Sequence, residues 1–168
     1  MKKLGVLLLA LLTLGSCNEK TGSVLPIAST IAINEDDTKD SIVLKAAHVV
    51  PTPNQYEALK NEFIAFIHFG PNTFTRMEWG NGMEDPKIFN LQNLDTDQWC
   101  KAMKSAGMKM VIITVKHHDG FVLWQSRYTN HGIMSSPYKE GQGDVLKELS
   151  ASCQKFGIKL GVYLSPAD

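Results

Sequence analysis

Several features are scarce or missing in this sequence, and each absence argues against a class of protein. The 168 residues carry 17 basic and 17 acidic side chains. No basic excess is therefore available to hold a nucleic-acid backbone, and no nucleic-acid partner is expected. The sequence contains no G-x-x-x-x-G-K-[ST], no G-x-S-x-G and no C-x-x-C. We expect a ligand that is neutral, or whose charge is matched locally.

The apolar runs of the sequence are also short. The longest, from Leu4 to Leu14, holds about eleven residues, whereas a helix that spans a bilayer needs about 20. Lys2 and Lys3 precede this run, and a basic start followed by a short apolar core is typical of a secretory signal peptide. The sequence therefore predicts export without a transmembrane helix in this segment.

Cysteine is scarce, with 3 residues in the chain. The first, Cys17, closes the segment Leu14-Gly15-Ser16-Cys17, which resembles a bacterial lipobox. The resemblance implies cleavage before Cys17 and acylation of its thiol and of the new amino group; an ordinary signal peptide with an incidental cysteine is the alternative. Acyl chains attach a protein to a membrane without a spanning helix. We expect an exported protein, lipid-anchored to a bacterial cell membrane on the periplasmic side or at the cell surface.

The other two cysteines, Cys100 and Cys153, fall in predicted helices. Export permits a disulfide, and an even pair remains once Cys17 is set aside. Cys153, however, shares an apolar helix face with Leu149 and Phe156. We therefore predict buried free thiols, with a disulfide as the alternative.

Composition divides the chain into three parts. Residues 1–16 are the predicted lipoprotein signal peptide, residues 17–47 a polar tether, and residues 48–168 the folded part. The tether is assigned because its residues are small, polar and aperiodic, as in a linker.

Apolar periodicity predicts alternating strands and helices in the folded part. Asp95 and Asp144 are suited to cap the N-termini of two helices, and Gly107 and Gly157 are suited to end them. Loops as long as those that follow the first two strands are usually functional. The predicted strands are 63–68, 110–115 and 158–164, the helices are 54–59, 95–107 and 144–157, and the two long loops are 70–94 and 116–143.

This order predicts an α/β fold with parallel strands and right-handed crossovers. A (β/α) barrel and a doubly wound sheet share the order, but the latter more often has a glycine-rich phosphate turn after its first strand. The segment His68-Phe69-Gly70-Pro71-Asn72 is not such a turn. A closed barrel takes about 250 residues. We therefore predict the N-terminal part of a (β/α)8 TIM-type barrel, with about three β/α units, belonging to a larger enzyme.

Histidines follow two of the predicted strands. His68 follows the first, and His117 and His118 follow the second, directly before Asp119 and Gly120. Binding and catalytic groups gather at the carboxyl ends of parallel strands. A metal site is one alternative, although adjacent histidines chelate a single ion poorly. A purely structural role is the other, and hydrogen bonding to a polyhydroxylated ligand is the reading we favour.

Glu78 and Trp79 lie together in the first long loop. An indole offers an apolar face with one polar edge, which suits the half-apolar faces of sugars. The alternative is a tryptophan that pins the loop onto the sheet. Of the other tryptophans, Trp99 is expected in the core and Trp124 in loop packing.

Taken together, these residues resemble the α-L-fucosidases of glycoside hydrolase family 29. The resemblance covers about residues 48–168 and rests on several uncommon motifs in the same order. They are His68-Phe69-Gly70, Asn72-Thr73-Phe74-Thr75, Glu78-Trp79-Gly80, the helix from Asp95 to Gly107, Lys116-His117-His118-Asp119-Gly120-Phe121 with Leu123-Trp124, and Gly161-Val162-Tyr163-Leu164-Ser165-Pro166.

The resemblance implies a catalytic barrel and a retaining mechanism, in which two carboxyl groups lie about 5–5.5 Å apart. In the family the nucleophile is an aspartate and the acid/base a glutamate, both after the region present here, so no catalytic residue is expected within this chain. His68, His117 and His118 match histidines that hydrogen-bond the hydroxyl groups of fucose. Glu78 and Trp79 match the loop residues that complete the fucose pocket. Neither a cofactor nor a metal is implied.

The leading interpretation is therefore a lipid-anchored α-L-fucosidase that acts on fucosylated glycans, with the sugar-recognition half of its site in this chain. A non-catalytic sugar-binding lipoprotein and a metal-dependent hydrolase on a similar barrel are the alternatives. Many members carry a tyrosine pair at the end of the third strand, where this chain has Tyr163-Leu164.

Overall fold

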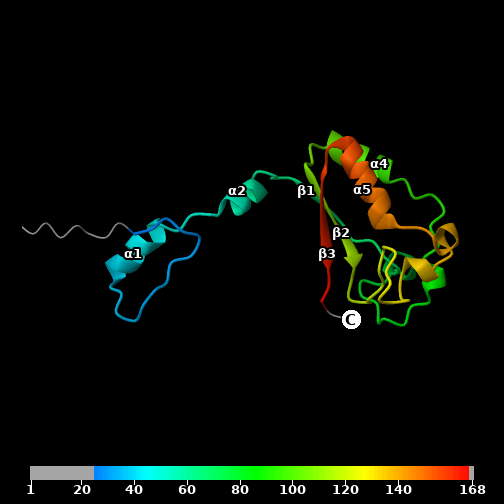
Figure 1. Ribbon diagram of the computed structural model, residues 1–168, viewed down its shortest axis with the longest axis horizontal. Coiled ribbons are helices and arrows are strands. Elements are labelled where there is room, and N and C mark those ends of the chain that lie inside the picture. The colour runs from blue at the N-terminus through cyan, green and yellow to red at the C-terminus, as the bar shows by residue number, and fades with distance from the viewer. Residues whose placement is uncertain (1–24, 167–168) are drawn as a thin grey trace, which may run out of the picture. The chain divides into compact units, whose positions relative to one another are not determined.

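The computed structural model of the chain describes residues 25–166. The predicted signal peptide and the predicted lipidation site at Cys17 lie outside the described residues. Two compact units divide at Thr52 and Pro53, and each is described by itself (Figure 1). No helix among the described residues is long and apolar enough to cross a membrane.

The first unit contains a helix that the sequence analysis did not predict. Helix α1 spans Lys39–Ala47, within residues 17–47, which were assigned to a polar tether without a predicted helix. Local polar groups specify the helix: Thr38 caps it by accepting a hydrogen bond from the backbone N–H of Ser41, and Lys45 pairs with Asp37 at 2.5 Å. No residue of α1 is buried, so it has no apolar stripe for periodicity to reveal.

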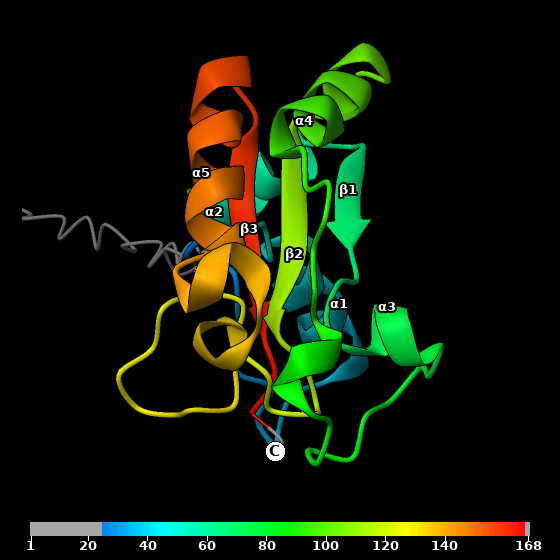
Figure 2. The same ribbon diagram turned by 90° about the vertical axis from the view of Figure 1, so that its right-hand side faces the viewer.

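The second unit is built on a parallel sheet of three strands in the order β1-β2-β3. After helix α2, Pro53–Leu59, the strands are β1 Ile64–Ile67, β2 Met110–Lys116 and β3 Lys159–Leu164. Helices α4, Thr96–Ser105, and α5, Val145–Phe156, lie side by side on one face of the sheet (Figure 2). The predicted α/β class, the three strands and these helices are confirmed.

The predicted caps explain where α4 and α5 begin and end. Asp95 accepts a hydrogen bond from the N–H of Gln98, and Asp144 accepts one from the N–H of Lys147. Gly107 and Gly157 follow the helices with φ of 84° and 67°, in the left-handed region that glycine enters at least cost.

The two faces of the sheet differ in burial. Val111 and Ile113 of β2 point toward the helices and are fully buried, as is Phe89 from the first long loop. On the other face the parallel register aligns Phe66 with Ile112 and Ile112 with Gly161. Phe66 on this face is 58% exposed, and its ring meets that of Tyr163 edge-on at a centroid distance of 6.1 Å. Within residues 25–166, this second face is therefore largely open.

The two predicted long loops contain short helical turns and their own buried side chains. In the first loop these turns are α3, Asn72–Thr75, and η1, Pro86–Ile88; in the second they are η2, Ile133–Ser135, and η3, Tyr138–Gly141. The loops are thus ordered parts of the core. The fully buried or nearly fully buried apolar side chains of the loops include Phe89, Phe121, Leu123 and Ile133.

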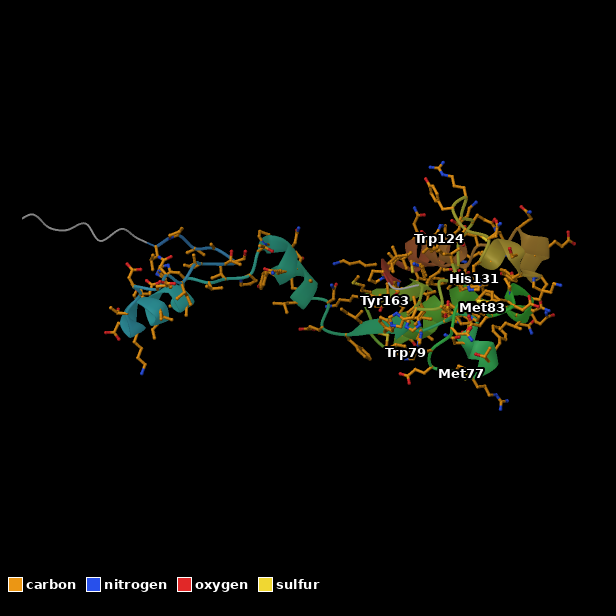
Figure 3. The ribbon with its side chains drawn as sticks, turned by 90° about the horizontal axis from the view of Figure 1, so that it is seen from below. Met77, Trp79, Met83, Trp124, His131 and Tyr163 are labelled. Carbon is orange, nitrogen blue, oxygen red and sulfur yellow. The ribbon has the colours of Figure 1, made fainter. Side chains whose placement is uncertain are left out.

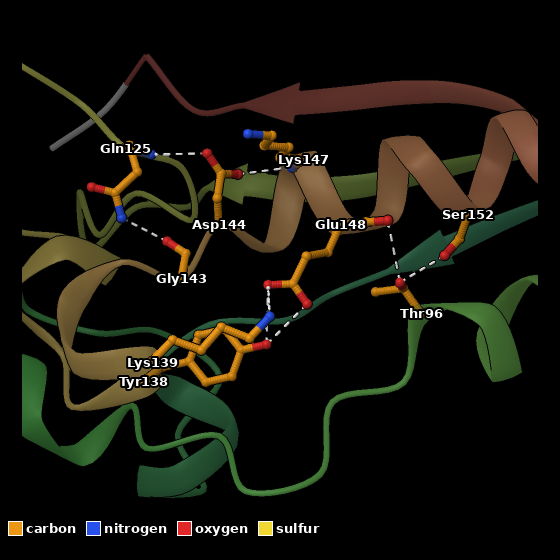
Figure 4. A network of polar contacts seen from close by, with 9 residues as sticks. All are labelled: Thr96, Gln125, Tyr138, Lys139, Gly143, Asp144, Lys147, Glu148 and Ser152. Carbon is orange, nitrogen blue, oxygen red and sulfur yellow. Dashed lines mark hydrogen bonds and ion pairs between the residues drawn. The ribbon is translucent and has the colours of Figure 1, made fainter.

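A polar network ties the second loop to α5 (Figure 4). The hydroxyl of Tyr138 donates to the carboxylate of Glu148 at 3.0 and 3.1 Å, and the ammonium group of Lys139 pairs with the same carboxylate at 2.8 Å. The side-chain amide of Gln125 donates to the carbonyls of Gly141 and Gly143. These contacts hold a segment in which Lys139 has a positive φ of 50°.

The two cysteines described are free thiols in the interface between α4 and α5, as predicted. Cys100 is 0% exposed and Cys153 is 2% exposed, and their sulfur atoms lie 3.8 Å apart. Burial raises the pKa of the Cys100 thiol and raises the pKa of Cys153 to about 12. Both groups therefore stay protonated at neutral pH.

We expect neither thiol to react in the folded protein, because the thiolate is the reactive form and both sulfur atoms are buried. Iodoacetamide labelling at pH 8, followed by peptide mass spectrometry, should modify Cys100 and Cys153 only after unfolding in guanidinium. Labelling of either cysteine at the same rate in folded and unfolded protein would contradict this.

Candidate functional site

The candidate site forms where the three parallel strands end. His68 follows β1, His117 and His118 follow β2, and Ser165 follows β3. Parallel pairing brings these ends to one edge of the sheet. Two contacts hold the edge together: Thr114 exchanges hydrogen bonds with the backbone N–H and C=O of Phe69, each at 3.1 Å, and the N–H of Ser165 donates to the carbonyl of Lys116 at 3.0 Å.

The three histidines form one cluster. The ring centroids of His68 and His117 lie 4.3 Å apart, and those of His117 and His118 lie 4.2 Å apart. Successive residues on a strand point to opposite faces. Because β2 ends at Lys116, His117 and His118 lie beyond that alternation and both reach the cluster.

Trp79 joins the cluster through His118. Its ring centroid lies 4.7 Å from that of His118, with 38° between the ring planes, and the side chain is 60% exposed. Figure 3 labels Trp79 and Met77, both from the segment that follows α3. An indole that packs on an imidazole and keeps much of its surface exposed can serve as a platform for an apolar ligand face.

Glu78 borders a small adjoining cavity of about 140 Å³. His68 and Met77 line the same cavity, and Asn72 lies at its base as a buried residue. The structure thus brings together all the predicted site residues of the folded part, namely His68, Glu78, Trp79, His117 and His118.

The surroundings of His117 shift the pKa of its imidazole. Burial lowers the pKa of its imidazole below the ordinary 6.5, and the neighbouring rings of His68 and His118 lower it further. Its Nδ1 atom is buried and has no hydrogen-bond partner among the described residues. A neutral imidazole with an unused polar atom is suited to exchange a hydrogen bond with a ligand hydroxyl.

The structure adds residues that the sequence analysis did not select. Ser165, 1% exposed, hydrogen-bonds Nδ1 of His118 at 2.8 Å and so orients that ring. The Tyr163 ring lies 6.0 Å from that of His117. Both residues belong to a motif that marks the end of β3, but only strand pairing shows that they reach the histidines.

Two described aspartates have structural partners, whereas Glu78 borders the cavity beside His68. Asp144 caps α5, and both oxygens of Asp119 accept hydrogen bonds. Among residues 25–166, no group of three or more His, Cys, Asp or Glu side chains is placed to hold a metal ion.

Comparisons with known proteins converge on one family. The sequence profile of the family described as Alpha-L-fucosidase matches residues 73–168. Over 119 residues the chain is 46% identical to Alpha-L-fucosidase 1 of Arabidopsis thaliana, covering 71% of this chain and 24% of the plant protein. A putative alpha-L-fucosidase 1 of Oryza sativa subsp. japonica is 48% identical over 122 residues, with the same coverage of each chain.

Solved structures show the same relationship. A putative alpha-L-fucosidase from Bacteroides ovatus is 51% identical, with a TM-score of 0.83, covering 85% of this chain and 25% of that one. A Ruminococcus gnavus GH29 fucosidase, solved in complex with fucose, is 42% identical with a TM-score of 0.65, covering 70% and 25%. The chain therefore spans about a quarter of the length of these relatives.

We expect the lowered pKa of His117 to reduce folding stability in acid. Below pH 6.5 the unfolded chain binds the proton more readily than the folded one, so stability is full above the unfolded pKa and declines as the pH falls below it. Urea unfolding at pH 7.5 and pH 5.5 should show a smaller acid-induced loss in the His117→Gln variant than in the parent.

His48→Gln, a change in the other unit, is the control and should keep the pH dependence of the parent. An NMR titration of the His117 ring proton should give a midpoint below 6.5. A midpoint at or above that value would show that burial does not control this imidazole.

Proposed function

Because the chain belongs to the α-L-fucosidase family, we propose that the complete protein hydrolyses terminal α-L-fucosyl linkages of oligosaccharides or glycoconjugates. This chain supplies the half of the site that recognises the sugar. The observation that carries the proposal is the cluster of His68, His117 and His118 beside Trp79, at the carboxyl edge of a parallel sheet.

The sugar-binding roles follow from the chemistry of these side chains. Fucose is a neutral deoxy-sugar with several hydroxyl groups and one methyl group. Neutral imidazoles can donate and accept hydrogen bonds with hydroxyls, and Nδ1 of His117 is buried without a partner in the described part of the chain. The exposed face of Trp79 offers an apolar wall for the methyl group. Glu78, at the edge of the cavity, completes the polar contacts.

The proposed barrel accounts for the open parts of the sheet. Phe66 and Ile64 are 58% and 39% exposed on one face, and β3 pairs only with β2 in the described residues. In a closed (β/α)8 barrel such a face becomes the interior and such an edge pairs with a further strand. We assign this chain to the N-terminal three β/α units of that barrel.

The bond-breaking groups are assigned to residues beyond 168. A retaining glycosidase needs a nucleophile and an acid/base about 5–5.5 Å apart. Asp119 and Asp144 already serve as hydrogen-bond acceptors within the fold, and Asp168 lies outside the described residues. The family resemblance implies that the aspartate nucleophile and the glutamate acid/base of the proposed mechanism come after this region, at a later strand end and in a later loop.

We also propose that the protein is exported and attached to a bacterial membrane through acylated Cys17. The basic start, short apolar core and Leu14-Gly15-Ser16-Cys17 segment support this assignment. An anchor at residue 17, followed by further chain before Pro53, would leave the catalytic part free to meet glycans outside the cytoplasm.

Replacing His117 and His118 together by alanine in the complete protein should abolish measurable fucose affinity, at least about a 100-fold loss, because two hydroxyl-binding groups disappear. Isothermal titration with L-fucose measures the affinity, and turnover of an aryl α-L-fucoside measures the activity. The complete protein should be active, whereas residues 1–168 alone should not be.

His48→Ala is the matched control, since it removes an imidazole from the first unit, and it should bind fucose like the parent. Undiminished binding by the double variant would overturn the site. Binding without turnover by the complete protein would instead favour the non-catalytic sugar-binding alternative, and activity lost on chelation, with bound metal, would favour the metal-dependent one.

The lipid anchor predicts that a bacterial host expressing the complete gene incorporates labelled palmitate into the protein. Cys17→Ser should abolish the label and move the protein from the membrane fraction to the soluble exported fraction, because acylation requires the thiol. Cys100→Ser is the control and should keep the label. A labelled Cys17→Ser protein would show that the cysteine is incidental.

A further inference from the structure

Asp119 is a buried carboxylate that the proposed chemistry does not use. It is 2% exposed and directly follows His118. Its Oδ1 accepts a hydrogen bond from the backbone N–H of Phe121 at 2.8 Å, and its Oδ2 accepts one from Nδ2 of Asn72 at 3.0 Å. A buried charge is costly unless such bonds compensate it, so its retention beside the histidines calls for a physical reason.

Asn72 is the other half of this buried pair. It is 7% exposed and lies in the short helix α3, four positions after His68. A carboxylate only accepts hydrogen bonds, so the amide of Asn72 must present its NH₂ group to Asp119. Its Oδ1 is thereby turned away and is buried without a partner among the described residues.

Gly80 packs closely against Asn72 and Asp119. A Cβ atom on Gly80 would fall 2.7 Å from Cβ of Asp119 and 2.9 Å from Oδ1 of Asn72. Real Cβ atoms do not approach so closely, so this position requires glycine. The backbone beside Trp79 therefore packs directly on the buried pair.

The segment after Gly80 is closed by its own hydrogen bonds. The carboxylate of Glu84 accepts from the N–H of Asn81 at 2.7 Å and from the N–H of Gly82 at 3.0 Å. The side chain of Asn81 accepts from the N–H of Met83 at 2.9 Å. These bonds close a compact turn, and its contact at Gly80 is next to Trp79 in the chain.

The Asn72–Asp119 pair thus joins the three segments that carry the predicted sugar-binding groups. Asn72 belongs to the segment of His68, Asp119 to the segment of His117 and His118, and Gly80 to the segment of Trp79. We propose that Asn72 and Asp119 are positioning residues that hold Trp79 against His118 and thereby preorganise the sugar site, with Gly80 as the point of contact. This inference rests on the proposed function.

The chain offers a matched control for the cost of losing a buried asparagine. Asn61 is 6% exposed and contacts Met110 and Lys159, the first residues of β2 and β3, at the opposite edge of the sheet. Asn72→Ala and Asn61→Ala delete the same group from equally buried positions. Both variants should lower the thermal unfolding midpoint, whereas only Asn72→Ala should disturb the sugar site.

In the complete protein, Asn72→Ala should weaken L-fucose binding by at least about tenfold, since small displacements of binding groups have effects of this size. The KM for an aryl α-L-fucoside should rise more than kcat falls. Asn61→Ala should keep the fucose affinity of the parent within about twofold. Equal effects of the two variants on fucose affinity would show that Asn72 contributes only to folding stability, and this would overturn the proposal.

A reciprocal exchange tests the pair itself. Asn72→Asp places two carboxylates face to face and should weaken fucose binding at least as much as Asn72→Ala. Adding Asp119→Asn restores one amide and one carboxylate with the roles reversed, and it should recover most of the affinity. Asp119→Asn alone completes the double-mutant cycle. Absence of coupling in this cycle would also overturn the proposal.

A readout without sugar separates this inference from the proposed function. The readout is acrylamide quenching of the fluorescence of Trp79, which is obtained as the difference between each protein and its Trp79→Phe counterpart. This quenching should increase in Asn72→Ala and in Gly80→Ala but not in Asn61→Ala. If the parent binds no fucose, the proposed function fails while this measurement still decides the positioning role. Unchanged quenching of Trp79 in both site variants would refute that role.

Discussion

The parallel pairing of β1, β2 and β3 is the constraint on which the rest of the site depends. Each strand brings the residues that follow it to the same edge, so His68 meets His117 and Ser165 meets His118 although these residues are far apart in sequence. The Thr114 bonds to Phe69 lock the first two ends together. Sheet pairing thereby preorganises the site. It holds the rings of His68 and His117 with their centroids 4.3 Å apart before any ligand binds.

Polar contacts add to the apolar packing that secures the loops above this edge. Tyr138 and Lys139 hold one loop through Glu148, and Asn72 holds another through Asp119. Such groups are costly when unpaired, so each pair favours a single loop arrangement over many. The apolar core beneath, around Val111 and Ile113, supplies burial but does not specify where the loop side chains lie.

In the proposed function, sugar recognition and bond cleavage lie in different parts of the sequence. The described residues at the cluster are mainly imidazoles and an indole, and Asp119 beside them is engaged as a hydrogen-bond acceptor. A cluster of this kind suits a neutral ligand with many hydroxyls, in keeping with a chain whose formal net charge is zero. Family membership and this chemistry agree.

Local rules were sufficient for much of the molecule. The apolar run before His117 predicted β2, and Asp95, Asp144 and Gly157 predicted helix ends, because strand burial and helix capping depend on near neighbours. The same rules failed for α1, where polar caps without an apolar stripe left no periodic signal.

The sequence motifs identified the candidate site residues, but they could not predict how these residues are arranged relative to one another. Neighbours in sequence cannot show that Trp79 packs on His118, that Ser165 orients the same ring, or that Asn72 meets Asp119 across 47 positions. Those contacts arise only after the strands pair and the loops close, because they join segments whose separation along the chain carries no local preference.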